Sequence, residues 1–85
     1  MLFYRSKHDI YPLVDIITVF LERAGRRSQF ENTIHYKVVV QLKHGIQLKV
    51  LEARNRLKAS GKANSVRKFL NIPGELQLRD FSVDE

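Results

Sequence analysis

Between residues 33 and 52, apolar and polar residues alternate, and this pattern constrains the fold more than any other feature of the sequence. A period of two is typical of a half-buried strand. Gly45 falls near the middle, where a three-residue turn, Lys43 to Gly45 with the glycine left-handed, would join two such strands. The resulting cross-strand pairs place apolar residues on one shared face: Leu42 with Ile46, Val40 with Leu48, and Val38 with Val50. The sequence therefore predicts a β-hairpin.

A helix is the alternative for residues 28–59. Ser28 and Glu31 fit a capping box. Apolar residues also recur at helical spacing, at Val39, Leu42, Ile46, Val50, Ala53 and Leu57. Two features count against this reading. Gly45 inside a helix costs about 1 kcal/mol, and Val38–Val40 is a β-branched run that prefers strands. We favour the hairpin.

The flanking segments add two helices and two strands. Met1 to Ser6 alternates and predicts a short strand. A helix capped by Asp9, with Pro12 in its first turn, is expected to run to Gly25. Its apolar face would be Leu13, Ile16, Ile17, Phe20 and Ala24. A second helix is expected from Glu52, with a break at Ser60-Gly61 and an end at Pro73-Gly74. Leu76, Leu78 and Phe81 suggest a last strand.

The predicted elements follow the order strand, helix, strand, strand, helix, strand. This is the order of a ferredoxin-like α+β domain (βαββαβ), with an antiparallel sheet and two helices on one face. A mainly α-helical small domain is the alternative. Residues 1–85 are predicted to form a single domain, with a frayed acidic tail at residues 82–85.

Cysteine is absent from the 85 residues, which removes disulfides and thiolate chemistry from consideration. No signal peptide is recognisable at Met1 to Lys7. The longest apolar stretch, Leu13 to Leu21, is far shorter than the roughly 20 residues that span a bilayer. We expect a cytoplasmic protein with no membrane partner.

Positive charge is concentrated in the middle of the chain. The formal net charge is +6, but residues 23–68 hold twelve cations and only two acids, Glu31 and Glu52. The two ends are net acidic. Such a segment is suited to the phosphates of a nucleic acid. The candidate contact residues are Lys37, Lys43, Lys49, Arg54, Arg56, Lys58, Lys62, Arg67 and Lys68.

These patterns predict a non-enzymatic nucleic-acid-binding protein, such as a small regulator, with DNA and RNA left undistinguished. The alternative is a protein-binding module or assembly subunit that docks on an acidic protein surface. Free strand edges would also allow a homodimer. No catalytic constellation is visible, and the three histidines lack the spacing of metal ligands. We therefore expect no enzyme activity, metal or cofactor.

Overall fold

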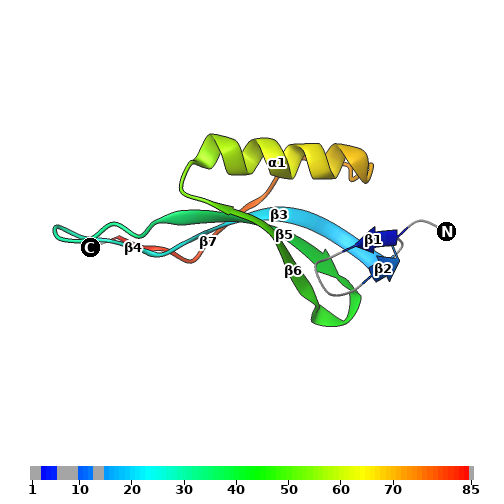
Figure 1. Ribbon diagram of the computed structural model, residues 1–85, viewed down its shortest axis with the longest axis horizontal. Coiled ribbons are helices and arrows are strands. Elements are labelled where there is room, and N and C mark those ends of the chain that lie inside the picture. The colour runs from blue at the N-terminus through cyan, green and yellow to red at the C-terminus, as the bar shows by residue number, and fades with distance from the viewer. Residues whose placement is uncertain (1–2, 6–9, 13–14, 85) are drawn as a thin grey trace.

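The computed structural model of the chain describes residues 3–5, 10–12 and 15–84, with side chains described from residue 15 onward. Figure 1 shows one helix lying over one face of a twisted sheet. In chain order, the elements are β1 (Phe3–Arg5), β2 (Ile10–Pro12), β3 (Ile16–Ala24), β4 (Arg26–Arg27), β5 (His35–Leu42), β6 (Gln47–Ala53), α1 (Arg56–Phe69), β7 (Leu78–Asp80) and β8 (Val83–Asp84).

The main sheet has four strands in the order β6-β5-β3-β7. β3 pairs with β5 in the antiparallel sense and with β7 in the parallel sense, so the sheet is mixed. β4 and β8 continue the parallel pairing beyond the sheet, and β1 and β2 form a separate hairpin. Within the described residues there is one α-helix, so both the ferredoxin-like fold with two helices and the mainly helical alternative are wrong.

The first helix that the sequence suggested is the central strand β3. Asp9 and Leu13 lie outside the described residues, and Pro12 closes β2 instead of opening a helix. Helical spacing misled here because Val19, Phe20 and Leu21 are all buried, so apolar residues occur on both faces of the strand. A strand covered on both faces cannot be distinguished from a buried helix by periodicity. The β-branched run from Ile16 to Val19 is the local signal that favours a strand.

The hairpin at residues 35–53 is confirmed. Lys43–Gly45 forms the turn, and the Leu42 N–H donates to the Ile46 carbonyl over 2.8 Å. Gly45 has a positive φ of 76°. Val40 lies opposite Leu48 as expected, but an irregularity shifts the register and places Val38 opposite Leu51. The predicted Val38–Val50 pair is therefore wrong by one residue.

α1 is continuous through Ser60-Gly61, where the sequence suggested a break. The side chain of Asn55 caps it by accepting from the N–H groups of Leu57 (2.8 Å) and Lys58 (3.2 Å). Ala59 and Ala63 are completely buried against the sheet on either side of Gly61. Packing of this face outweighs the roughly 1 kcal/mol by which glycine disfavours a helix.

α1 ends before the expected Pro73-Gly74. Asn71 is left-handed with φ 56°, and the Ile72 N–H donates to the Arg67 carbonyl over 3.0 Å. Together with the bond from the Asn71 N–H to the Lys68 carbonyl, this is the Schellman pattern of a helix C-terminus. The last expected strand is present as β7. Where a frayed tail was expected from residue 82, Val83 and Asp84 pair with Arg26 and Arg27.

The core lies between α1 and the sheet. Its buried side chains are Val19, Leu21, Val38, Val40, Leu42, Ala59 and Ala63. Alanine at both helix positions lets α1 approach the strands closely. Val66 and Leu70 extend the contact toward the end of the helix. This packing determines which side of α1 faces the sheet and which side faces solvent.

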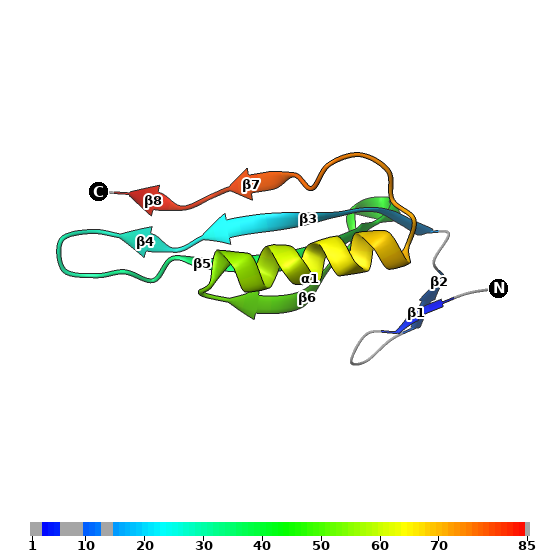
Figure 2. The same ribbon diagram turned by 90° about the horizontal axis from the view of Figure 1, so that it is seen from above.

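A β-arm, residues 25–34, projects beyond the N-terminal end of α1 (Figure 2). It contributes to a radius of gyration of 14.0 Å, against about 12 Å for a compact chain of this length. Gly25 lies at its base with φ 101°, and a Cβ there would meet the Thr33 carbonyl oxygen at 2.3 Å. Phe30 at the tip is 92% exposed.

Replacing Gly25 with alanine is expected to lower the free energy of unfolding by about 3 kcal/mol, because the backbone is strained and the added methyl group clashes. A fall of about 10 °C or more in Tm would follow. Gly74→Ala is the matched control, since Gly74 also has a positive φ of 86° but open space around it. Equal losses in the two variants, measured by thermal unfolding, would contradict the close approach at Thr33.

Candidate nucleic-acid interface

The predicted contact residues of the sheet are paired with acids. Lys37 and Lys49 lie on the face away from α1, because the residues next to them in their strands, Val38 for Lys37 and Leu48 and Val50 for Lys49, pack into the core under the helix. The Lys37 Nζ is 3.9 Å from a Glu22 carboxylate oxygen, and the Lys49 Nζ is 2.9 Å from a Glu52 oxygen. The hydrogen bond from Lys49 holds the pKa of Glu52 below its ordinary value. Each of these two lysines has a carboxylate beside it, so both attract phosphate less than unpaired cations would.

Arg67 is buried and serves the fold. Its side chain is enclosed by α1, β3 and the chain after the helix, and the residue is 6% exposed. Its guanidinium donates to the Val19 carbonyl over 2.8 Å, to the Pro73 carbonyl over 2.9 Å and to the Thr18 hydroxyl over 3.4 Å. Arg67 is therefore not placed to contact a phosphate.

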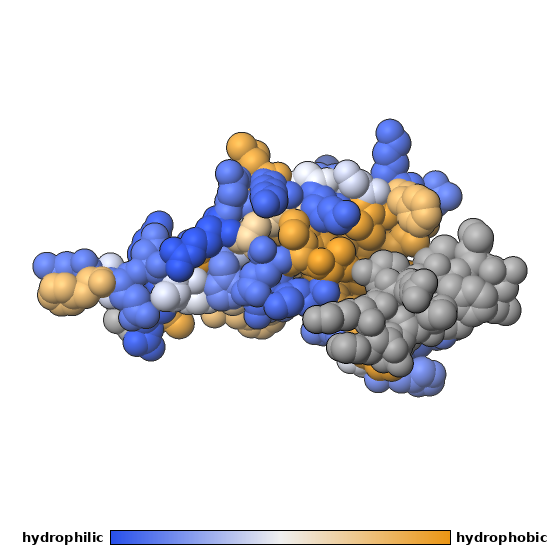
Figure 3. All heavy atoms as spheres, in the orientation of Figure 1, coloured by the Kyte–Doolittle hydropathy of each residue, from blue (hydrophilic) through white to orange (hydrophobic). Residues whose placement is uncertain are grey.

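The remaining candidates are exposed. Lys43 lies alone in the β5–β6 turn. The other five gather on α1 and the turn before it and form what we call the basic helix surface: Arg54, Arg56, Lys58, Lys62 and Lys68. In the described residues none of the five has an ion-pair partner, and residues 53–74 contain no acid. Hydrophilic side chains project along α1 in Figure 3, with hydrophobic ones among them.

The placement of cations at the start of α1 is unfavourable for the helix itself. Arg56 and Lys58 occupy the first turn, which has no acidic residue. The helix dipole favours negative charge there and disfavours positive charge by a few tenths of a kcal/mol up to about 1 kcal/mol per residue. Residues that break such a local rule are typical of functional surfaces.

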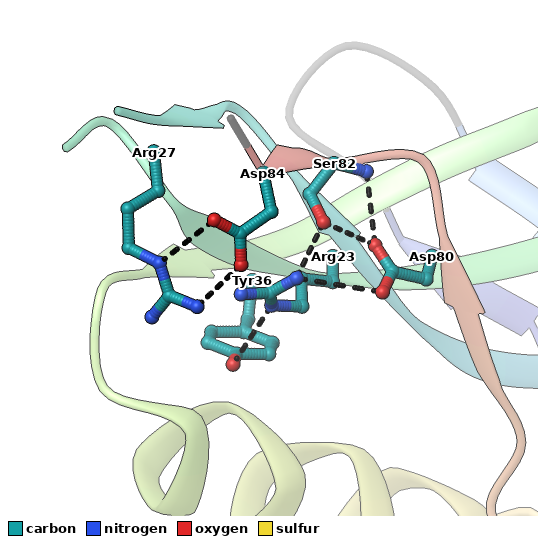
Figure 4. Close-up of polar contacts among 6 residues, drawn as sticks. All are labelled: Arg23, Arg27, Tyr36, Asp80, Ser82 and Asp84. Atoms are coloured by element: carbon teal, nitrogen blue, oxygen red, sulfur yellow. Dashed lines mark hydrogen bonds and ion pairs between the residues drawn. The ribbon is translucent and has the colours of Figure 1, made fainter. Parts of the chain in front are cut away.

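The acidic C-terminal segment neutralises two arginines of the middle segment. Figure 4 shows this C-terminal clamp, formed by Arg23, Arg27, Tyr36, Asp80, Ser82 and Asp84. Arg23 donates to the Tyr36 hydroxyl (3.3 Å), to an Asp80 oxygen (3.4 Å) and to Ser82. Arg27 donates to both oxygens of Asp84. The clamp joins β7 and β8 to β3 and β4, and it leaves unpaired positive charge concentrated on α1.

Protonating the two clamp carboxyls is expected to weaken the fold. Hydrogen bonds from Ser82 lower the pKa of Asp80, and hydrogen bonds from Arg27 lower the pKa of Asp84. A folded-state pKa below the unfolded value of about 3.9 adds stability above that pH. This stability is lost as the pH falls through the folded-state values. Urea unfolding from neutral pH down to about pH 2.5 should therefore show a steeper acid loss than in Asp80→Asn/Asp84→Asn. Identical pH profiles would refute the contribution of the clamp.

A pocket of about 350 Å³ lies where β5 begins and β6 ends, lined by Thr33, His35, Glu52, Ala53 and Arg54. His35 Nδ1 is 2.8 Å from the Thr33 carbonyl oxygen, and His35 Nε2 is 3.2 Å from a Glu52 oxygen. Both ring nitrogens thus face acceptors of the protein itself.

Sequence reasoning missed three contacts of charged residues. The guanidinium of Arg79 stacks 3.9 Å from the centre of the Phe20 ring and helps to cover the sheet face opposite α1. The clamp pairs of Arg27 with Asp84 and Arg23 with Asp80 each join residues 57 positions apart. The opposite charges of the two segments were the visible signal, but they did not reveal which residues meet.

The described residues hold no cluster of three or more histidine, cysteine, aspartate or glutamate side chains that could bind a metal. α1, the one α-helix described, is neither long nor apolar enough to cross a membrane. No family model, curated protein or solved structure matches the chain, so its function has to be inferred from its own residues.

Proposed function

We propose that this chain is a non-enzymatic nucleic-acid-binding protein that contacts phosphates through the basic helix surface. The observation that carries the proposal is the set of five exposed cations on α1 and its preceding turn, with no acid in residues 53–74 and no ion-pair partner in the described part of the chain. Cations that the protein does not neutralise itself are available to replace counterions on a nucleic acid.

The proposed interface is confined to α1 and the turn before it and does not include the sheet. Lys37 and Lys49 face Glu22 and Glu52, and Arg67 is buried. A phosphate approaching the sheet face would also meet those two carboxylates. The outer side of α1 presents no such repulsion, so it is the better surface for a polyanion.

A role without catalysis is part of the proposal, because His35 has both nitrogens engaged and no other acid–base pair accompanies it in the pocket. A small cytoplasmic regulator of DNA or RNA is the biological role that fits best.

A protein partner is the second candidate, and two exposed apolar side chains favour it. Leu57 is 81% exposed and Phe69 is 79% exposed, one near each end of α1. Covering these side chains at an interface would remove their apolar surface from water. An acidic protein surface would satisfy both these residues and the lysines between them. The homodimer expected from the strand edges also stays a prediction.

Fluorescence anisotropy separates the two candidates. Labelled DNA and RNA, single-stranded and duplex, are titrated at low and near-physiological salt, and poly-glutamate competes for the bound protein. We expect a Kd on the order of 1–100 μM near physiological salt, a steep salt dependence, and poor competition by poly-glutamate at equal charge. Failure to bind any of the four nucleic acids at low salt would overturn the proposal and leave the protein partner.

A further inference from the structure

The residues at the middle of the outer side of α1 are small. Successive helical residues turn by about 100°, so with Ala59, Ala63 and Val66 against the sheet, Gly61 and Ser65 point away from it. A Cβ at Gly61 would meet no atom within 4 Å. The Ser65 hydroxyl folds back onto the helix and donates to the Gly61 carbonyl over 3.0 Å. The backbone of α1 can therefore come close to whatever it docks against.

Cations flank these small residues on one side and follow them along the helix. Lys58 and Lys62 project on one side, and Lys68 lies near the centre line one and a half turns further on. Along the axis, Lys58 and Lys68 are about 15 Å apart at 1.5 Å per residue. Asn64 projects on the side opposite Lys62, is exposed, and could offer its amide to a base edge.

We propose that α1 lies in the major groove of duplex B-form DNA, with Gly61, Ser65 and Lys68 nearest the base edges and Lys58 and Lys62 on the phosphates. This inference rests on the proposed function and names its ligand. The major groove of B-DNA is about 12 Å wide and 8.5 Å deep and admits an α-helix. Figure 1 shows the outer side of α1 clear of the sheet strands, as groove entry requires.

The same features disfavour the other nucleic acids. The major groove of A-form RNA is too narrow for side chains to read, and recognition of duplex RNA goes through its shallow minor groove. Single strands are bound by neighbouring aromatic side chains on which bases stack. The strongly exposed phenylalanines, Phe30, Phe69 and Phe81, lie on the arm, on α1 and after β7, so they do not make one stacking platform.

The test enlarges the side chain at the centre of the outer surface. Gly61→Ala and Gly61→Gln should both raise Tm, because either residue favours a helix more than glycine does. Gly61→Gln should bind duplex DNA about tenfold more weakly, because the helix can no longer approach the base edges, and Gly61→Ala, which adds only a methyl group, should lose less. Ser60→Gln is the control, since it adds a long side chain turned by about 100° from the groove.

Comparison of ligands completes the test. At equal salt the original chain should bind duplex DNA about tenfold more tightly than duplex RNA of the same sequence or either single strand. It should also protect guanine N7, which lies in the major groove, from methylation by dimethyl sulfate. Equal or tighter binding of RNA or of single strands, or unchanged binding by Gly61→Gln, would overturn groove insertion while leaving nucleic-acid binding in place. Absence of binding to all four ligands would overturn both proposals.

Discussion

Replacing Lys58 and Lys62 with glutamine should weaken duplex DNA binding on the order of fifty-fold at about 0.1 M salt, whereas Lys37→Gln/Lys49→Gln should change it less than about threefold. Both double variants remove two positive charges, so they have the same net charge. They differ in where the charge is lost. Lys58 and Lys62 have no acidic partner in the described residues, while Lys37 and Lys49 already face Glu22 and Glu52.

The salt dependence gives an independent readout. Each phosphate contact contributes about 0.9 to the slope of log K against log salt for B-DNA. Loss of two contacts should therefore reduce the slope by about 1.8 in the α1 variant and leave it almost unchanged in the sheet variant. Anisotropy titrations at several salt concentrations measure both quantities. Equal losses in the two variants would show that only net charge matters and would remove α1 as the interface.

The hairpin was predictable because its information is local. Alternation from Tyr36 to Val50 and the glycine at position 45 specify two strands and their turn with no knowledge of the rest of the chain. The shift in register at Val38 was not predictable in the same way. The extra residue on β6 leaves no mark in the alternation of residue types.

The error at β3 had a different cause. A run from Ile16 to Leu21 is apolar at every position except Thr18, so it matches a helix face and a fully buried strand equally well. Whether this run forms a helix or a strand depends on segments that are distant in sequence, since β3 pairs with β5 on one side and β7 on the other. One local signal favoured a strand, namely a run of four β-branched residues: Ile16, Ile17, Thr18 and Val19.

For the candidate site, the sequence shows which segment is positively charged. It does not show which of the charged side chains are exposed and without an ion-pair partner. The basic segment is visible in the sequence, yet the ion pair of Lys37 with Glu22 joins neighbouring strands and requires the register of β3 on β5. Arg67 is the exception, because a signal was present. It follows Ala63 by four residues, so helical spacing places it on the same side as Ala59 and Ala63.

Replacing Arg67 with alanine should lower the free energy of unfolding by about 3–5 kcal/mol, the largest stability effect expected in this chain. The change leaves the Val19 and Pro73 carbonyls without the donor that each has now. An unsatisfied buried polar group costs about 1–3 kcal/mol, and the lost side chain adds a cavity. A domain of this size has only about 4–13 kcal/mol in total, so Tm should fall by about 10 °C or more.

Lys68 provides the matched control, one residue further along the same helix. Lys68→Ala removes the same charge from an exposed position, so it should change stability by less than about 0.5 kcal/mol while weakening DNA binding. Arg67→Lys keeps the charge and one possible donor contact, so it should recover part of the loss and stay folded for measurement even if the alanine variant does not. Thermal unfolding of the three variants distinguishes a structural role from a role in binding. If Arg67→Ala were as stable as Lys68→Ala, the guanidinium would not be fixed between α1 and β3, and Arg67 would belong with the cations of the basic helix surface.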